Sequence, residues 1–351
     1  MKQEEIDDIY MYRCLQLAAN GRQLAKPNPM VGAVIVSQDG RIIGEGYHVR
    51  CGEGHAEVNA FRSVRPEDEH LLPQATIYVS LEPCSHHGKT PPCADLIVRK
   101  GVHRVVCGCI DPFAEVQGRG IARIREAGIE VKVGVLEKEC LALNRQFIVR
   151  NKQHRPYIIL KWAQTDNGKI AYSPTRKPYT PLQISTPFTK ILVHKLRAES
   201  DAILVGNTTQ MLENPQLNVR EWSGNHPQKL VLSHTHTADD GITLHSLEEV
   251  VQLSEKSDGS DKSDWADNSA QPNKSHSHHT IPSRPITSLI VEGGAQTLES
   301  FIAQGLWDEI RIETAPFSIA EGIDAPELPK NAVLQSIAHY ENTIKTYMRS
   351  E

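Results

Sequence analysis

Apolar and polar residues alternate with two different periods along the first 150 residues. Apolar side chains recur three or four positions apart over residues 4–21, which predicts an amphipathic helix. Apolar runs at 30–36 (MVGAVIV) and 41–48 (RIIGEGYH) flank Asp39-Gly40, which predicts a β-hairpin. Further patterns predict, in chain order, a helix at 55–64, a strand at 75–83, a helix at 93–100, a strand at 103–112, a helix ending near Gly128 and a strand at 129–136. Strands that alternate with helices indicate an α/β sandwich.

A second unit of the same kind follows the polar passage VRNKQHRP. A fresh strand is predicted at 156–164 (PYIILKWAQ), so we place the boundary near Asn151 and expect domains at 1–150 and 151–351. A chain of 351 residues is also too long for one typical hydrophobic core. The patterns of the second unit predict strands at 201–206, 228–233, 286–294 and 308–316 and helices at 187–199 and 296–304.

One stretch of the second unit carries no such pattern. Residues 254–285 are rich in Ser, Asp and Lys and nearly devoid of apolar side chains. A segment of this composition cannot bury enough apolar surface to order itself. We therefore expect a flexible loop there.

Composition and charge exclude several classes of function. The net charge of −5 and the 5% aromatic content provide neither the basic surface nor the stacking side chains of a nucleic-acid-binding protein. No apolar run approaches the roughly 20 residues of a membrane span, and the first residues, MKQEEIDD, lack the pattern of a signal peptide. We expect a cytoplasmic protein with a small-molecule substrate and no nucleic-acid or membrane partner, assembled as a homo-oligomer.

The cysteines are confined to the first unit. All seven lie at or before Cys140, and the second half has none. An odd number of cysteines without a secretion signal argues against a disulfide framework and for free thiols with a metal or catalytic site.

The fragments GHAEVNA and PCSHHGKTPPC bring together residue types that bind zinc. Two thiolates, from Cys84 and Cys93, and the imidazole of His55 are good zinc ligands, and three protein ligands leave the fourth tetrahedral position for water. Glu57 lies two positions after His55, and residues two apart do not share a helix face. Glu57 is therefore better placed as an acid/base beside the metal than as a ligand.

The combination is more specific than any of its parts. A lone histidine is usually a packed or surface residue, and two cysteines nine apart are a weak signal. H-A-E followed by two Pro-Cys pairs resembles the zinc deaminase signature H-x-E…P-C-x-x-C, although eight residues rather than two separate Cys84 from Cys93. A closed structural zinc site would need a fourth ligand, for which Cys51 and His86 are the nearby candidates.

The longer spacer resembles one branch of that superfamily, the bifunctional deaminase–reductases of riboflavin biosynthesis. The matching stretches are KPNPMVGAVIV, GEGYH, GHAEVNA, LEPCSHHGKTPPCAD and GCIDPFAEVQGRG. The resemblance implies a cytidine-deaminase-like α/β/α sandwich that hydrolyses the 2-amino group of a diaminopyrimidinone bearing a phosphoribosylamino group. It implies one zinc per chain held by His55, Cys84 and Cys93, with Glu57 moving protons. It also implies substrate contacts from Asn28, His48, Lys89 and Asp111.

The second half lacks the G-x-G-x-x-G fingerprint of a dinucleotide-binding Rossmann unit. It has instead SLIVEGGAQTLESFI, in which a strand, Glu292 and a Gly-Gly turn precede a helix. The glycines let the backbone approach an anion, and the free amides of the helix start can receive a phosphate. Residues 206–209 (GNTT) repeat this arrangement after another strand, although each fragment alone is compatible with a plain strand–helix turn.

These pieces resemble the reductase domain of the same family, whose fold is like that of dihydrofolate reductase. The supporting stretches are LKWAQTDNGKIA, LRAESDAILVG, ENPQLNVR, LIVEGGA and LWDEIRIETAP. The family's reaction reduces the opened ribose of the deaminated product to ribitol with NADPH. The implied cofactor-binding residues are Ala163, Ser185, Thr209, Glu213, Gly294, Ala295, Gln296, Thr297, Leu298, Glu299 and Ser300. The implied contacts to the phosphosugar are Arg197, Leu217, Arg220 and Glu292, and arginine is well suited to grip phosphate.

Departures from the family pattern concentrate in this half. The family's W-I-T is Gln183-Ile184-Ser185 here, its D-D-P is Glu213-Asn214-Pro215, and in the first half its D-P-N ends in Phe113. Glutamine cannot stack as tryptophan does. One alternative is therefore an active deaminase whose reductase domain is impaired or regulatory.

Several residues also have a plainer structural role open to them. Asn28 between two prolines could only shape a turn, Asp111 could cap a helix, and Lys89, Arg197 and Arg220 could be solvated charges. Two other functions explain the sequence less well. A nucleic-acid deaminase would need a basic face and stacking aromatic side chains, which do not fit this acidic chain. A structural zinc module fused to a nucleotide-binding regulatory domain would leave Glu57 unexplained.

Overall fold

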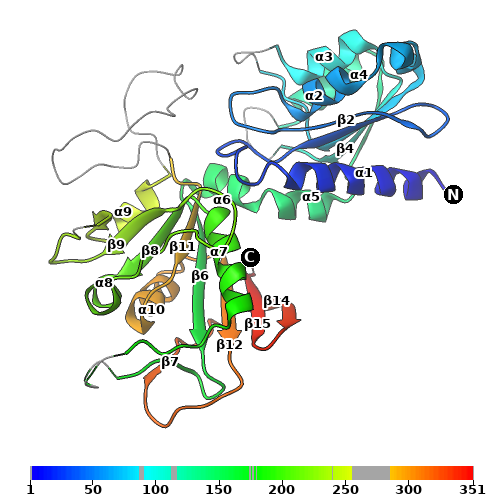
Figure 1. The fold of residues 1–351 in the computed structure, drawn as a ribbon. Helices are drawn as coiled ribbons and strands as arrows, with labels where there is room; N and C mark the ends of the chain where they lie inside the picture. Colours follow the sequence, from blue (N-terminus) through cyan, green and yellow to red (C-terminus); the bar gives the residue numbers. More distant parts are fainter. Residues whose placement is uncertain are drawn as a thin grey trace. The chain divides into compact units, whose positions relative to one another are not determined.

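The computed structural model describes residues 2–86, 91–111, 117–173, 175, 178, 180–238, 240–254 and 285–350. These residues form two compact units, which divide between Gln153 and His154 (Figure 1). The loop expected at 254–285 falls almost entirely on residues outside the described ranges. Among the described residues, no helix is both long enough and apolar enough to cross a membrane.

The first unit is built on a five-stranded sheet. Its strands are β1 (Gly32–Val36), β2 (Ile42–Tyr47), β3 (Thr76–Leu81), β4 (Arg104–Cys109) and β5 (Glu130–Val133), in the order β2-β1-β3-β4-β5. β1 is antiparallel to β2 and to β3, and β3, β4 and β5 are parallel. The predicted hairpin and the three later strands are confirmed. Because β3 and β4 run in parallel, the segments that follow them emerge at the same edge of the sheet.

Helices cover both faces of this sheet. The alternation along β1 directs Ala33 and Ile35 into a core shared with α2 (Ala56–Ser63), α3 (Cys93–Lys100) and α4 (Arg119–Glu126), while Val34 and Val36 face α1 (Gln3–Ala19) and α5 (Glu137–Leu143). This arrangement is the expected α/β/α sandwich. The pattern did not indicate η1 (Pro66–Gln74), α5 or α6 (Arg145–Gln153).

Glycines allow α2 to lie very close to β2. A Cβ on Gly46 would come within 2.3 Å of the backbone nitrogen of Ala60, and a Cβ on Gly44 within 2.6 Å of the Ala60 carbonyl. No side chain fits there, so both positions require glycine. The close approach fixes the start of α2, and with it His55.

A buried ionic cluster ties α1 to the sheet. The carboxylate of Asp7, which is fully buried, accepts hydrogen bonds from both terminal nitrogens of Arg104 at 2.8 and 2.9 Å, from Lys132 at 3.0 Å and from the Tyr78 hydroxyl at 3.0 Å. Burial opposes the ionisation of Asp7, but the hydrogen bonds from Arg104, Lys132 and Gln3 outweigh it and hold its pKa well below the usual range.

The second unit is built on an eight-stranded sheet of order β10-β9-β8-β11-β6-β12-β15-β14. Its strands are β6 (Tyr157–Gln164), β8 (Ala202–Gly206), β9 (Gln228–Leu232), β10 (Ile242–Leu244), β11 (Ser288–Val291), β12 (Glu309–Thr314), β14 (Ala332–His339) and β15 (Thr343–Arg349). The first six strands in this order, β10, β9, β8, β11, β6 and β12, are mutually parallel. The strands β15 and β14 add an antiparallel hairpin at one edge. A short pair, β7 (Lys169–Ala171) with β13 (Ile323–Asp324), forms a separate two-stranded sheet.

Among the described residues of this unit, the helices are α7 (Pro187–Ala198), α8 (Asn207–Glu213), α9 (Leu247–Gln252) and α10 (Ala295–Ala303). Leu298 and Phe301 of α10 and Leu247 and Val250 of α9 pack with Ile158, Leu160 and Trp162 of β6 in one core. Lys161 and Ala163 therefore point to the opposite face of the sheet. The predicted strands and the helices at 187–199 and 296–304 are confirmed.

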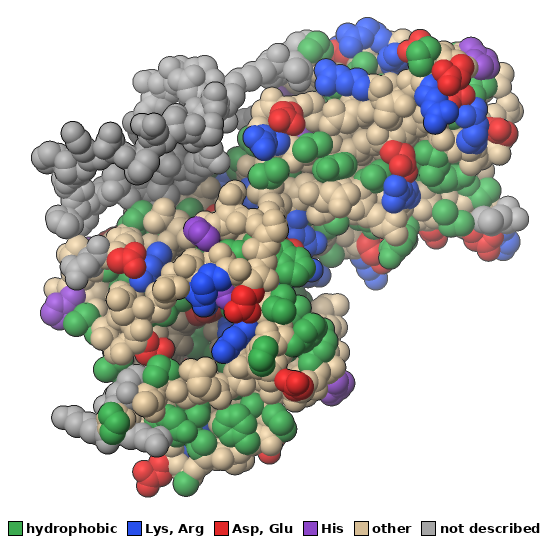
Figure 2. All heavy atoms as spheres, in the orientation of Figure 1, with side chains coloured by type: hydrophobic (Ala, Val, Ile, Leu, Met, Phe, Trp, Pro, Cys, Tyr) green, Lys and Arg blue, Asp and Glu red, His purple; other side chains and the backbone are tan. Residues whose placement is uncertain are grey.

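Charged side chains are mixed on the visible surface. Figure 2 shows lysine and arginine interspersed with aspartate and glutamate rather than gathered into one basic patch on that face. This face offers no electrostatic footprint for a nucleic acid.

Candidate active sites

Three side chains of zinc-binding type converge at one edge of the first sheet. His55 immediately precedes α2, Cys84 follows β3 by three residues, and Cys93 begins α3. The His55 Nδ1 atom lies 3.5 Å from the Cys84 Sγ atom and 3.4 Å from the Cys93 Sγ atom, and the three donor atoms lie within 4.8 Å of one another. Tetrahedral zinc with ordinary bond lengths separates its nitrogen and sulfur ligands by about 3.6 Å. The donor set therefore fits zinc in both chemistry and spacing.

The electrostatics of the cluster favour a bound cation. Hydrogen bonds from the Cys93 thiol and from His55 outweigh burial and lower the pKa of the Cys84 thiol to about 4. The backbone N–H of Cys93 also donates to the Cys84 Sγ atom at 3.3 Å. A lowered pKa favours the thiolate form of Cys84, which is the form that ligates metal.

Glu57 lies beside this cluster in the first turn of α2. Its residue is 3% exposed, and burial raises the pKa of its carboxyl group although the nearby His55 opposes that effect. A buried carboxyl group with a raised pKa is suited to take up and release a proton during a reaction.

Two of the predicted substrate residues adjoin the metal ligands. The Nδ1 atom of His48 lies 3.2 Å from the Gly54 carbonyl, and its Nε2 atom lies 3.2 Å from the amide nitrogen of Asn28. Because the Gly54 carbonyl can only accept and the Asn28 NH2 group can only donate, His48 is held as the neutral Nδ1–H tautomer. Burial lowers the pKa of His48 in the same sense. Its ring meets that of His55 edge to face, with centroids 5.4 Å apart.

The other two predicted substrate residues are placed differently. Asp111 follows β4 and is buried near the same edge of the sheet, and Lys89 lies outside the described residues.

Glu82 is a buried residue of this edge that was not among the predicted site residues. Its buried carboxylate accepts backbone hydrogen bonds from Asp111 at 3.2 Å and from Gly118 and Gly120 at 2.9 Å. Glu82 therefore fixes the start of α4 and the end of β4 against the turn that carries Cys84. The sequence feature that could have indicated this role is an acidic residue between a predicted strand and a Pro-Cys turn.

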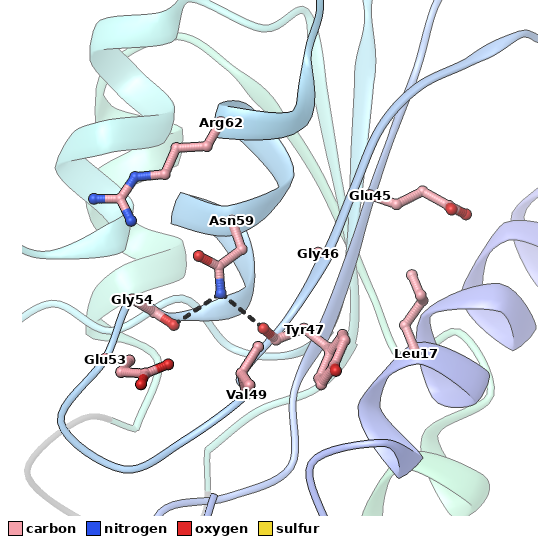
Figure 3. A pocket seen from close by; sticks show the side chains of 9 residues that line it. All are labelled: Leu17, Glu45, Gly46, Tyr47, Val49, Glu53, Gly54, Asn59 and Arg62. Carbon is pink, nitrogen blue, oxygen red and sulfur yellow. Dashed lines mark hydrogen bonds between the residues drawn. The ribbon is translucent and has the colours of Figure 1, made fainter.

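A pocket of about 630 Å³ opens beside β2 and α2 (Figure 3). Its wall includes Asn59, whose side-chain amide donates to the carbonyls of Tyr47 at 2.8 Å and Gly54 at 3.0 Å. None of the metal-ligand cluster lines it. We therefore assign the catalytic chemistry to the His55, Cys84 and Cys93 cluster rather than to this pocket. Asn59 helps to fix the peptide that precedes His55.

In the second unit, the two glycine turns meet at the carboxyl edge of the sheet. β8 and β11 are neighbours, so the turn at Gly206 lies next to that at Gly293-Gly294. A Cβ on Gly206 would come within 2.2 Å of the Thr297 Oγ1 atom, and one on Gly294 within 3.6 Å of the Thr209 Oγ1 atom. The starts of α8 and α10 thus form one glycine-walled edge with free helix N-termini, which suits a phosphate-bearing cofactor.

The remaining predicted cofactor residues are spread over this edge and beyond it. Ser300 donates its hydroxyl to the Thr297 carbonyl at 2.7 Å, and the side chain of Leu298 is fully buried in the core, where it packs α10 against the sheet. Ala163 is the penultimate residue of β6, the strand that neighbours β11 on the side away from β8, and Ser185 immediately precedes the N-cap of α7.

The predicted phosphosugar residues come together around an ion pair. A terminal nitrogen of Arg197 lies 2.7 Å from Glu292 Oε2, and another donates to the Asn218 carbonyl at 3.3 Å. Leu217 is buried with a positive φ of 51°, which turns the chain so that the N–H of Arg220 reaches the Nδ1 atom of His194 at 2.9 Å. The structure therefore brings the backbone at Leu217 and Arg220 against α7, while the exposed guanidinium of Arg220 donates to the side chains of Gln216 and Asn218.

Two buried atoms of this cluster have no described partner. They are Glu292 Oε1 and Arg197 Nε. Buried polar atoms are rarely left unpaired, so both are suited to a bound molecule.

Lys161 and His194 belong to this cluster and were not predicted. Burial alone would raise the pKa of Glu292, but the charges of Lys161 and Arg197 lower it. His194 is buried, and burial together with Arg197 lowers its pKa. The signal for Lys161 was available, because the alternation along β6 places it on the same face as Ala163.

Comparison with known proteins finds a different family match for each of the two units. Residues 4–109 match the cytidine and deoxycytidylate deaminase zinc-binding region, and residues 156–339 match the RibD C-terminal domain. The riboflavin biosynthesis protein RibD of Aquifex aeolicus is 36% identical over 341 residues, which cover 95% of this chain and 93% of that protein. The RibD protein of Escherichia coli is 45% identical over 217 residues, covering 62% of this chain and 56% of that one.

A solved structure extends the similarity to nearly the whole chain. It is a diaminohydroxyphosphoribosylaminopyrimidine deaminase/5-amino-6-(5-phosphoribosylamino)uracil reductase from Thermotoga maritima, with a TM-score of 0.82 and 29% identity over 99% of this chain and 100% of that one. The sequence, the fold and the His55, Cys84 and Cys93 cluster agree, and the expected fold class is confirmed in both units. The chain belongs to the RibD family of riboflavin-biosynthesis proteins, and its two units are a zinc-dependent deaminase and an NADPH-dependent reductase.

Proposed function

We propose that the chain catalyses two consecutive steps on one phosphoribosylaminopyrimidine. The first is hydrolysis of the 2-amino group of 2,5-diamino-6-(5-phosphoribosylamino)pyrimidin-4-one, and the second is reduction of the ribosyl group of the product to ribityl. The match to the Thermotoga maritima enzyme over 99% of this chain supports the substrate assignment. The observation that carries the first step is the His55, Cys84 and Cys93 cluster with Glu57 buried beside it.

For the deamination, we assign each residue by its position. His55, Cys84 and Cys93 would hold zinc, which when bound lowers the pKa of water and makes it a nucleophile. Glu57 would take a proton from that water and deliver it to the departing amino group, so that water and amine become carbonyl and ammonia. Asn28 and His48 would hold the pyrimidine beside the cluster, and Lys89 and Asp111 remain proposed substrate contacts.

For the reduction, we assign the glycine-walled edge to the cofactor. NADPH would lie along the starts of α8 and α10, against Thr209, Gly294 and Thr297, and would supply hydride. The further proposed contacts to the cofactor are Ala163, Ser185, Glu213, Ala295, Gln296, Leu298, Glu299 and Ser300.

The cluster around the Arg197–Glu292 ion pair would receive the phosphosugar. Arg197 and Arg220 supply positive charge for the phosphate, and Leu217 shapes the wall. Glu292 and Lys161 lie where a hydroxyl or carbonyl of the opened sugar needs a partner. The arrangement of the side chains around Arg197 and Glu292 gives no support to an impaired reductase, although Gln183 and Asn214 depart from the family pattern.

The remaining assignments concern the whole molecule. We propose a deaminase domain at 1–150 and a reductase domain at 151–351, in a cytoplasmic homo-oligomer. The seven cysteines form no disulfide with one another, which suits a reducing compartment. The edge strand β14 exposes Val333, Leu334 and Ile337, which supports association through that edge.

A paired measurement on purified protein tests this proposal. Zinc per chain is counted, the diaminopyrimidinone substrate is supplied, and ammonia release and NADPH oxidation are followed separately. About one zinc with both signals is expected. Ammonia without NADPH oxidation would refute the reductase assignment, and zinc-loaded protein that releases no ammonia would refute the assigned substrate or the catalytic role of the metal.

A further inference from the structure

Glu313 of β12 is a buried carboxylate held by three neutral donors. Its Oε2 atom accepts from the Ser185 hydroxyl at 2.6 Å, and its Oε1 atom accepts from the Thr189 hydroxyl and from the Asn342 amide, both at 2.6 Å. The residue is 3% exposed. Distances this short are typical of hydrogen bonds to an ionised carboxylate. Burying such a charge is costly unless its hydrogen bonds are made, so these three bonds hold the surrounding segments firmly.

The three donors come from three separate segments. Ser185 lies in the extended segment before α7, Thr189 in the first turn of that helix, and Asn342 in the turn between β14 and β15. Asn342 also donates to the Ile184 carbonyl at 3.0 Å. Two consecutive residues are thus held in place, Ser185 by the Glu313 carboxylate and Ile184 by Asn342, which itself donates to Glu313.

The sheet register places this carboxylate beside the proposed cofactor site. In the parallel pairing of β12 with β6, Glu313 is the partner of Ala163. Ile310 and Ile312 face the core, so Glu313 points to the same side of the sheet as Ala163. Of the three residues that donate to Glu313, Thr189 and Asn342 are buried, and Ser185 remains partly exposed. A ligand can therefore reach Ser185, while the carboxylate behind it stays covered.

We propose that Glu313 is a positioning residue of the reductase, which acts on the cofactor through Ser185. Because the hydroxyl proton of Ser185 is committed to Glu313, the Ser185 oxygen presents only lone pairs to a ligand. It accepts a hydrogen bond from an amide NH2 group or a sugar hydroxyl of the cofactor, and it disfavours a phosphate. This inference rests on the proposed placement of NADPH along Ala163 and Ser185.

A double-mutant cycle on the full-length, zinc-loaded protein tests the inference. Binding of NADPH is titrated by its fluorescence for the unaltered chain, Glu313→Gln, Ser185→Ala and the double variant. In Glu313→Gln the new amide donates toward Ser185, which turns the hydroxyl proton to the ligand. We expect each single variant to weaken NADPH binding about five- to tenfold, and the double variant to bind no more weakly than Ser185→Ala.

Two controls separate positioning from general support. Ammonia release by the deaminase unit of the same chain reports on folding and should not change. Thr189→Val removes another donor to the same carboxylate without touching Ser185, and it should lower the melting temperature with less than a twofold effect on NADPH binding. If Glu313→Gln disrupts the second unit, Glu313→Asp with Ser185→Ala gives the same cycle while keeping the charge.

The outcomes are distinct. Additive losses from Glu313→Gln and Ser185→Ala would overturn the inference while leaving the reductase function intact. Unchanged binding by Ser185→Ala, in a chain that binds and oxidises NADPH, would overturn the inference and the placement of the cofactor at Ser185 together. An unaltered chain that does not bind NADPH at all would refute the proposed reduction itself.

Discussion

Arg197 and Glu292 form an ion pair of 2.7 Å that joins α7 to the residue after β11. Both side chains are largely buried, with 12% and 13% exposed. A buried pair of this kind is costly to break from one side, since the remaining charge is left without a partner. Each residue also keeps an unpaired atom, so the pair is arranged to hold a ligand as well as the fold.

We predict that Arg197→Leu impairs only the second reaction. Loss of the guanidinium removes a phosphate-binding charge and leaves Glu292 unpaired, so the KM for the deaminated substrate should rise at least about tenfold. Steady-state NADPH oxidation measures this effect, with ammonia release as the internal control. Lys195→Leu, an exposed cation on the same helix, should change KM by less than about twofold. An equal effect of both substitutions would contradict a specific role for Arg197.

We predict that Glu57→Gln retains zinc and loses deamination. The amide has the size of the carboxyl group but cannot take up a proton, so ammonia release should fall about 10²–10⁴-fold. Metal analysis should still find zinc, because Glu57 is not among the ligands. Reduction of supplied deaminated intermediate should continue at the normal rate. Full turnover with full zinc occupancy would remove Glu57 from the mechanism.

The first site could be predicted from the sequence because its residues lie at the ends of strongly patterned elements. His55 and Cys93 start helices, Cys84 follows a buried strand, and the spacing of ligand types was itself informative. Glu82 was not foreseen as an anchor, since its partners are backbone N–H groups more than 25 residues away whose approach depends on tertiary packing.

The second site was harder to predict for a physical reason. Lys161 and Glu313 are single charged residues within strands, and only the parallel pairing of β6 with β12 shows that they lie on the same side of the sheet. The hairpin of β14 and β15 also escaped the pattern, because β14 is largely exposed and lacks regular alternation of buried residues.

We predict that Asp7 makes the first unit sensitive to acid. Its pKa is lowered on folding, so its contribution to stability is complete above the unfolded value of about 3.9 and is lost as the pH falls toward the folded value. Asp7→Asn leaves Arg104 and Lys132 without their carboxylate and should reduce the free energy of unfolding by about 3 kcal/mol near neutral pH.

Urea denaturation at several pH values checks this prediction. The difference between the unaltered chain and Asp7→Asn should be constant from about pH 5 to 8 and should shrink below about pH 4. Asp8→Asn changes an exposed aspartate on the same helix and should alter stability by less than about 0.5 kcal/mol. A difference that persisted undiminished at the lowest pH would show that Asp7 stabilises by packing rather than by charge.

We predict that the exposed edge of the second unit mediates self-association. β14 ends the eight-stranded sheet, and Ile337 on it is 45% exposed beside unpaired backbone groups. A lysine in an edge strand opposes pairing with another strand, so Ile337→Lys should convert an oligomer to monomers in light scattering coupled to gel filtration. Gln335→Lys adds the same charge at a polar position of that strand and should weaken association less. An Ile337→Lys variant that kept the oligomeric mass of the unaltered chain would place the interface elsewhere.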